Sequence, residues 1–169
     1  MDRDPIAINY FIENQTEMMG KYFDILRIPS VSTDPAHKAD MVRTAEFLAE
    51  YFKSLGMDRV EIFPTNVHPI LFAEKRSALP NAKTLLVYGH YDVQPPDPLH
   101  EWHTAPFEPT QVEDYVYARG ASDMKGQVMA SIFALESVLK TSELPINVKF
   151  IIEGEEEIGS PSLEDFLAN

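Results

Sequence analysis

The chain has 169 residues, of which 44% are hydrophobic, and this composition is typical of one globular domain. It contains no cysteine, which excludes disulfides, thiolate metal sites and a cysteine nucleophile. The net charge of −13 repels phosphate backbones and anionic membrane surfaces, so we expect neither a nucleic acid nor a membrane as partner.

The first half of the chain predicts two helices followed by short strands. Apolar residues at helical spacing predict an amphipathic helix over 5–26. Turn-forming residues end it, and a second helix is predicted over 37–55. The apolar period then changes, and 60–63 and 70–73 are short strand-like runs.

The second half alternates strands and helices. Residues 84–89 form a nearly continuous apolar run, which is typical of a strand buried on both faces of a parallel sheet, and 146–152 is a second buried strand. The clearest helix is predicted over 126–140, and a last one over 163–167. This alternation predicts an α/β fold with a largely parallel sheet flanked by helices.

Candidate functional residues follow the predicted strands, because sites in open α/β sheets lie at the carboxyl ends of the strands. His90 and Asp92 come directly after the first buried strand. A metal-binding imidazole usually donates its other N–H to a carboxylate, so this pair could supply a ligand and the group that orients it. The alternative is a surface histidine beside a turn aspartate.

Asp123 lies in a glycine-rich turn between a strand-like run at 115–117 and the helix predicted over 126–140. Its carboxylate could bridge two cations, with one oxygen on each. Aspartate is also a favoured residue at helix N-termini, and spacing alone favours this capping role.

Three adjacent carboxylates, Glu155, Glu156 and Glu157, follow the second buried strand. Such neighbours repel one another unless water or a cation neutralises them. Acidic runs are usually solvated loops. In the alternative, one glutamate binds a metal and its neighbour takes a proton from a water that the metal acidifies, acting as general base and later as general acid.

Three motifs, in this order, resemble the M20 family of co-catalytic zinc peptidases, and most closely the dipeptidase branch that includes the carnosinases. They are GHYDVQPP at 89–96, ARGASDMKG at 118–126 and EGEEEIGS at 153–160. The resemblance implies that His90 binds one zinc and that Asp92 orients His90. It further implies that Asp123 bridges two zincs, that Glu157 binds the second zinc and that Glu156 is the general base and acid. It also implies a cis peptide bond after Asp123.

The function implied by the resemblance is hydrolysis of the peptide bond of dipeptides or short peptides at a two-zinc site. Manganese or cobalt would also suit ligands of these types. Two alternatives stay open. One is an N-acyl amino acid deacylase of the same fold, and the other is a catalytically inactive fragment that could associate as a homo-oligomer.

The resemblance also predicts which part of the catalytic domain the chain represents, and the N-terminal residues bear on its location. Members of this family carry two further metal ligands and a lid or dimerisation domain, so we expect residues 1–169 to form the N-terminal segment of the catalytic domain, without its C-terminal part. The N-terminus is acidic and unlike a signal peptide, and no run approaches the ~18 apolar residues of a spanning helix. We therefore expect a cytoplasmic protein.

Overall fold

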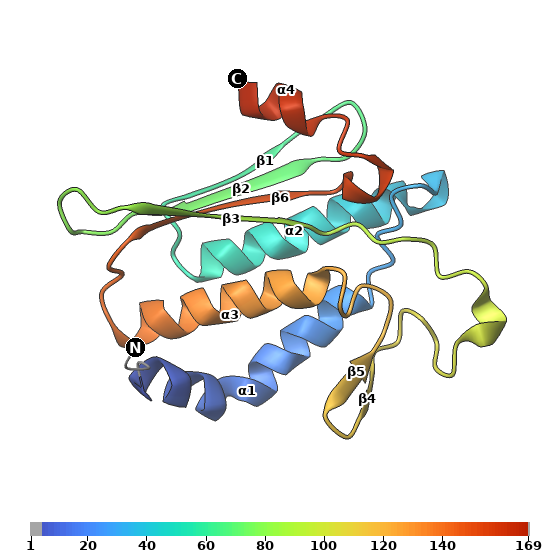
Figure 1. Cartoon of the computed structure of the whole chain (residues 1–169), viewed down its shortest axis with the longest axis horizontal. Helices are drawn as coiled ribbons and strands as arrows, with labels where there is room; N and C mark the ends of the chain where they lie inside the picture. The colour runs from blue at the N-terminus through green and yellow to red at the C-terminus, as the bar shows by residue number, and fades with distance from the viewer. Residues whose placement is uncertain (1–4, 169) are drawn as a thin grey trace.

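A four-stranded sheet in the order β1-β2-β6-β3 organises the computed structural model, which describes residues 5–168 (Figure 1). β1 pairs with β2 and β2 with β6 in antiparallel fashion, whereas β3 and β6 are parallel. The α/β class is confirmed, but the sheet is mixed rather than largely parallel. The short connection between β1 and β2 makes them an antiparallel pair, while the long crossover through α3 allows β3 and β6 to run parallel. The strands are β1 (Arg59–Phe63), β2 (Ile70–Lys75), β3 (Thr84–His90) and β6 (Asn147–Glu153).

Helices cover one face of the sheet in two layers (Figure 1). α2 and α3 lie against the sheet, and α1 packs on α3. The short helix α4 lies on the opposite side, where the ring of Phe166 meets that of Phe63 edge-on at 5.2 Å. The helices are α1 (Pro5–Leu26), α2 (Lys38–Ser54), α3 (Lys125–Thr141) and α4 (Leu163–Ala168). The predicted helices are confirmed to within about two residues, because the amphipathic period is a local signal.

The core lies between the sheet and the helices α2 and α3. Phe52 of α2 and Phe150 of β6 are fully buried, with ring centroids 4.8 Å apart. Met129 and Ile132 of α3 are also fully buried. No described helix combines the length and the apolarity that a membrane crossing requires.

Strand β3 differs from the prediction that it is buried on both faces. Among the described strands it pairs only with β6, and Leu85, Leu86 and Tyr88 are 50%, 53% and 45% exposed. An apolar run predicts a strand but does not determine whether that strand is central or at an edge, which explains the error. The predicted strand at 146–152 is confirmed as the interior strand β6.

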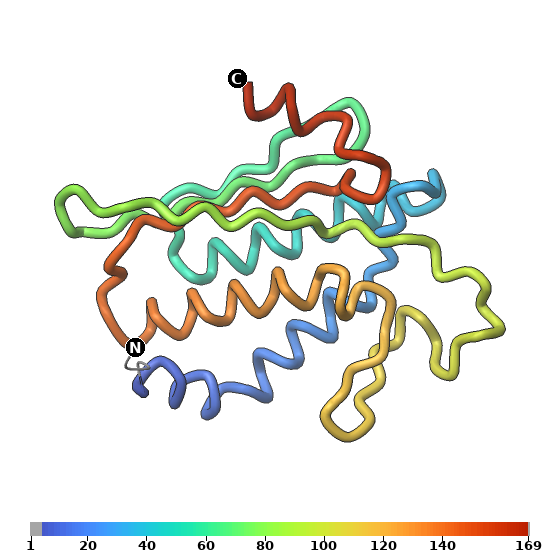
Figure 2. Tube along the Cα trace, in the orientation of Figure 1, coloured from blue at the N-terminus to red at the C-terminus, as the bar shows by residue number. Residues whose placement is uncertain are grey.

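The segment between β3 and α3 forms a separate hairpin of β4 (Thr110–Val112) and β5 (Tyr115–Tyr117). The chain trace shows this segment returning to the start of α3 beside the ends of β3 and β6 (Figure 2). Since β3 and β6 are parallel, their carboxyl ends meet at one edge, where His90 is the register partner of Glu153. The candidate site is built at this edge.

Candidate metal and catalytic site

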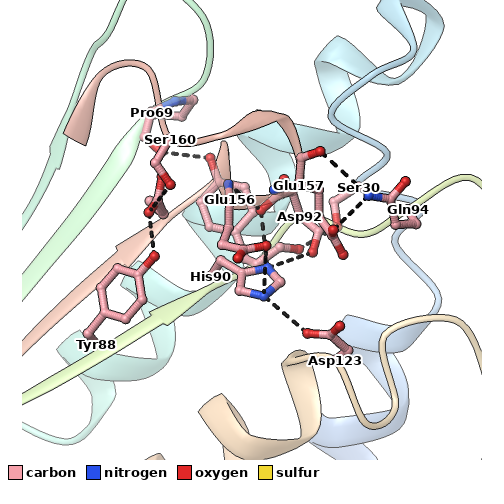
Figure 3. A network of polar contacts seen from close by, with 12 residues as sticks. Ser30, Pro69, Tyr88, His90, Asp92, Gln94, Asp123, Glu156, Glu157 and Ser160 are labelled. Atoms are coloured by element: carbon pink, nitrogen blue, oxygen red, sulfur yellow. Dashed lines mark hydrogen bonds and ion pairs between the residues drawn. The ribbon is translucent and has the colours of Figure 1, made fainter. Parts of the chain in front are cut away.

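His90 ends β3 with its imidazole buried and directed between three carboxylates (Figure 3). Its Nδ1 lies 3.2 Å from Oδ1 of Asp92 and 3.1 Å from the Asp92 carbonyl oxygen. Its Nε2 lies 3.2 Å from Oδ1 of Asp123 and 3.7 Å from Oε2 of Glu156. Because Nδ1 donates to Asp92, Nε2 is the nitrogen directed to the open side of the site.

The charges around His90 favour its protonated form in the metal-free protein. Burial of the ring opposes protonation, but the hydrogen bond and charge of Asp92, helped by the charge of Glu156, outweigh it and raise the pKa of His90 to about 9. A metal ion at Nε2 would replace this proton, so metal binding and deprotonation of His90 are coupled.

Asp92 connects the two strand ends. Its side chain is fully buried, and its oxygens accept hydrogen bonds from the backbone N–H groups of Glu156 at 3.3 Å and Glu157 at 3.1 Å. These two glutamates begin a single 3-10 turn, η3 (Glu156–Ile158), directly beyond β6. Asp92 therefore fixes both the imidazole of His90 and the turn that faces it.

The glutamates of this turn complete a group of close ligand atoms. One ligand atom from each of His90, Glu156 and Glu157 lies within 4.8 Å of the others. Gln94 donates from Nε2 to Oε2 of Glu157 at 2.7 Å (Figure 3). The interpretation of 155–157 as a solvated loop is wrong for Glu155, which is fully buried, whereas Glu156 is exposed.

Asp123 approaches the site from the turn before α3. Its side chain is 75% exposed, and its Oδ1 faces Nε2 of His90. The helix-cap interpretation is wrong, because Met124 and not Asp123 occupies the N-cap position of α3, and the side chain of Met124 makes no capping hydrogen bond. The peptide bond between Asp123 and Met124 is cis, as the resemblance implies.

Lys125 anchors this turn to the end of α1. Its side chain is fully buried, and Nζ donates to the carbonyl oxygens of Ile25 at 3.0 Å and Ile28 at 2.7 Å. Burial lowers the pKa of Lys125 to about 7. The bonds to two carbonyls hold the turn carrying Asp123 against the first helix.

The structure brings all five predicted site residues together, from three separate segments of the chain: His90, Asp92, Asp123, Glu156 and Glu157. Gln94 and Lys125 are not among the residues predicted from the sequence. Gln94 lies inside the first motif, two residues after Asp92, so its position was the available signal. A lone lysine ahead of a helix carries no comparable signal, because its partners are backbone carbonyls 97 and 100 residues away.

One imidazole and several carboxylates form a donor set that suits divalent cations. Zinc accepts nitrogen and oxygen ligands of these types, and manganese and cobalt do as well. The carboxylates of Asp123 and Glu156 both face Nε2 of His90, and Glu157 lies close by. Among the described residues, no lysine or arginine forms an ion pair with these three carboxylates. The residues present therefore fit a metal centre.

Comparisons with known proteins point to one family. The family model described as peptidase family M20/M25/M40 matches residues 86–169. The chain is 36% identical over 149 residues to human Beta-Ala-His dipeptidase, covering 82% of this chain and 29% of the relative. It is 33% identical over 170 residues to a Cys-Gly metallodipeptidase of Candida albicans, covering 90% of this chain and 35% of the relative. The chain thus spans about a third of the length of these curated relatives.

Solved structures agree with this result. The crystal structure of an M20 family metallo-carboxypeptidase from Sulfolobus solfataricus superposes with a TM-score of 0.81 at 42% identity, over 89% of this chain and 33% of that one. The fold and the matched residues, which include the strand ends that carry the candidate site, therefore indicate the same family.

Proposed function

This chain belongs to peptidase family M20, and on that premise we propose that it serves metal-dependent hydrolysis of the peptide bond in dipeptides or short peptides. The observation that carries the proposal is the convergence of His90, Glu156 and Glu157, with ligand atoms within 4.8 Å of one another, at the ends of two parallel strands. The relatives named as dipeptidases supply the substrate class. Residues 1–169 would contribute the N-terminal segment of the catalytic domain.

The ligand assignment is the one that the resemblance to the M20 family implies, and the grouping of these side chains around His90 supports it. His90, through Nε2, would hold one zinc, Glu157 would hold a second, and Asp123 would be shared between them. Asp92 keeps the imidazole oriented through Nδ1. When bound, the zinc ions would supply Lewis acidity, polarising the scissile carbonyl and acidifying the attacking water.

Glu156 is the proposed general base and acid. Its carboxylate is 44% exposed, so it can reach a water and a substrate in the site, while its backbone N–H is fixed by Asp92. In this role Glu156 takes the proton from the attacking water and delivers it to the leaving amine. In this proposal the roles of the neighbouring glutamates would be divided, with Glu157 as ligand and Glu156 as base.

The first test separates metal binding from proton transfer. Metal per chain is measured by elemental analysis after dialysis against micromolar zinc, and hydrolysis is measured on dipeptides and on N-acetyl amino acids. Glu156→Gln should keep the metal and lose hydrolysis, whereas Glu164→Gln on the exposed surface of α4 should change neither. Hydrolysis retained in Glu156→Gln would remove Glu156 from the base role. Preference for N-acetyl amino acids would replace the peptidase proposal by a deacylase.

The second test concerns the shared ligand. Asp123→Ala should lose both zincs together, because one carboxylate would contribute to both sites. Elemental analysis that finds one zinc remaining in Asp123→Ala would argue against bridging.

A further inference from the structure

Glu155 is a buried carboxylate beside the site that the proposed metal chemistry does not use. It is fully buried, and its Oε1 accepts hydrogen bonds from the Thr65 hydroxyl at 2.8 Å and the His68 backbone N–H at 2.9 Å. Its Oε2 accepts a hydrogen bond from the Ser162 backbone N–H at 2.9 Å. Among residues 5–168 it forms no ion pair, so these neutral donors stabilise its buried charge.

These bonds join segments that are far apart in the sequence. Thr65 and His68 lie in the loop between β1 and β2, and the chain trace shows the segment after β6 passing beside this loop (Figure 2). Glu155 directly precedes the η3 turn that carries Glu156 and Glu157. The carboxylate thus attaches the start of that turn to the β1–β2 loop.

The same loop is connected to the other candidate ligand segment. Nε2 of His68 lies 2.9 Å from the carbonyl oxygen of Ser32. Two residues earlier, the carbonyl oxygen of Ser30 accepts a hydrogen bond from the backbone N–H of Val93 at 2.9 Å. Residues 30–32 are therefore tied both to the segment that follows His90 and, through His68, to Glu155.

We propose that Glu155 is a positioning residue that sets the place of the Glu156–Glu157 turn relative to His90. Asp92 holds the turn from the side of β3, and Glu155 holds it from the side of the β1–β2 loop. The expected effect of Glu155 on metal affinity rests on the proposed function, whereas its expected effect on the position of the turn does not.

A glutamine at this position cannot reproduce the arrangement. Both carboxylate oxygens of Glu155 accept from donors, and glutamine offers one acceptor oxygen and one NH₂ group. In either orientation of the amide, an NH₂ group faces a backbone N–H. At least one hydrogen bond to the carboxylate is therefore lost in Glu155→Gln.

The experiment compares Glu155→Gln with Glu136→Gln by two measurements on the whole chain. Glu136 is the matched control, since its side chain is also buried and accepts hydrogen bonds, from Tyr51 and Tyr10, but it lies on α3. Amide hydrogen exchange is measured on the metal-free protein, and cobalt(II) binding is followed by its absorption spectrum.

Glu155→Gln should speed exchange at 156–160 and 65–68 by at least about 10-fold, the effect of losing one hydrogen bond to a charged group, while the core strands keep their protection. Cobalt(II) binding should weaken by about 10- to 100-fold, as expected when a group that orients a metal ligand is removed. Glu136→Gln should leave the turn and the cobalt(II) affinity unchanged.

A second variant guards against failure to fold. Thr65→Val removes one donor to Glu155 and leaves Glu155 in place, so exchange at 156–160 should rise with a smaller amplitude than in Glu155→Gln. Exchange at 65–68 is not used for this variant, because the hydroxyl also contacts the His68 carbonyl oxygen and the Val67 N–H. Unchanged exchange at 156–160 in both variants would overturn the proposal. If the wild-type chain binds no cobalt(II), the metal site proposed for residues 1–169 fails, and the exchange pattern alone then decides the role of Glu155.

Discussion

Replacing Gly154 by alanine tests how tightly the start of the site is packed. Gly154 follows β6 directly, and a Cβ placed there would lie 2.4 Å from both Cζ and Oη of Tyr91. Tyr91 is fully buried, and its hydroxyl donates to the carbonyl oxygen of Pro69 at 2.7 Å. The ring therefore has to move and lose this bond, or the backbone at Gly154 has to shift.

Two contributions determine how far Gly154→Ala lowers the free energy of unfolding: overpacking and the loss of a hydrogen bond. Overpacking a core position costs about 1–3 kcal/mol. Loss of the Tyr91 hydrogen bond adds about 0.5–1.5 kcal/mol. We therefore expect Gly154→Ala to lower the free energy of unfolding by about 1.5–4.5 kcal/mol, and the melting temperature by about 3–18 °C for a chain of this length.

Urea denaturation followed by circular dichroism measures the change as a lower midpoint at an unchanged m-value. Gly20→Ala is the control, because Gly20 lies within α1 and a Cβ there meets nothing within 4 Å. That variant should gain about 0.5–1 kcal/mol, since alanine favours a helix interior over glycine. A Gly154→Ala protein within about 0.5 kcal/mol of the wild type, the range of ordinary surface substitutions, would refute the packing argument.

Three further predictions concern the site and the core. Asp92→Ala should weaken zinc binding by about 10- to 100-fold in isothermal titration calorimetry, and an affinity within about threefold of the wild type would contradict its orienting role. Zinc at about 100 times its dissociation constant should stabilise the fold by about 2.7 kcal/mol in thermal melting, and a rise that persists in His90→Ala would place the metal elsewhere. Ile132→Ala, at a fully buried position of α3, should cost about 2–5 kcal/mol in urea denaturation, whereas exposed Leu167→Ala should cost less than about 0.5 kcal/mol; equal costs would contradict the assigned core.

The helices were predictable from the sequence because their signal is local. Apolar residues three and four positions apart lie on one helix face, so the bounds of α1, α2 and α3 follow from neighbouring residues alone. The five candidate site residues were also predictable, because each occurs in a short motif at the end of a strand or the start of a helix. Their roles as ligands and base stay predictions until metal is measured.

The tertiary structure decided features that depend on contacts distant in sequence. The apolar run of β3 predicted a strand but not its edge position, since strand order is set by pairing with β6 some 60 residues later. Glu155, Glu156 and Glu157 are chemically identical in the sequence. The β1–β2 loop, about 90 residues away, donates to one carboxylate oxygen of Glu155 and the Ser162 N–H donates to the other, while Glu156 and Glu157 face His90. Equal side chains acquire different functions because folding determines which of them meet donors and which meet other ligands.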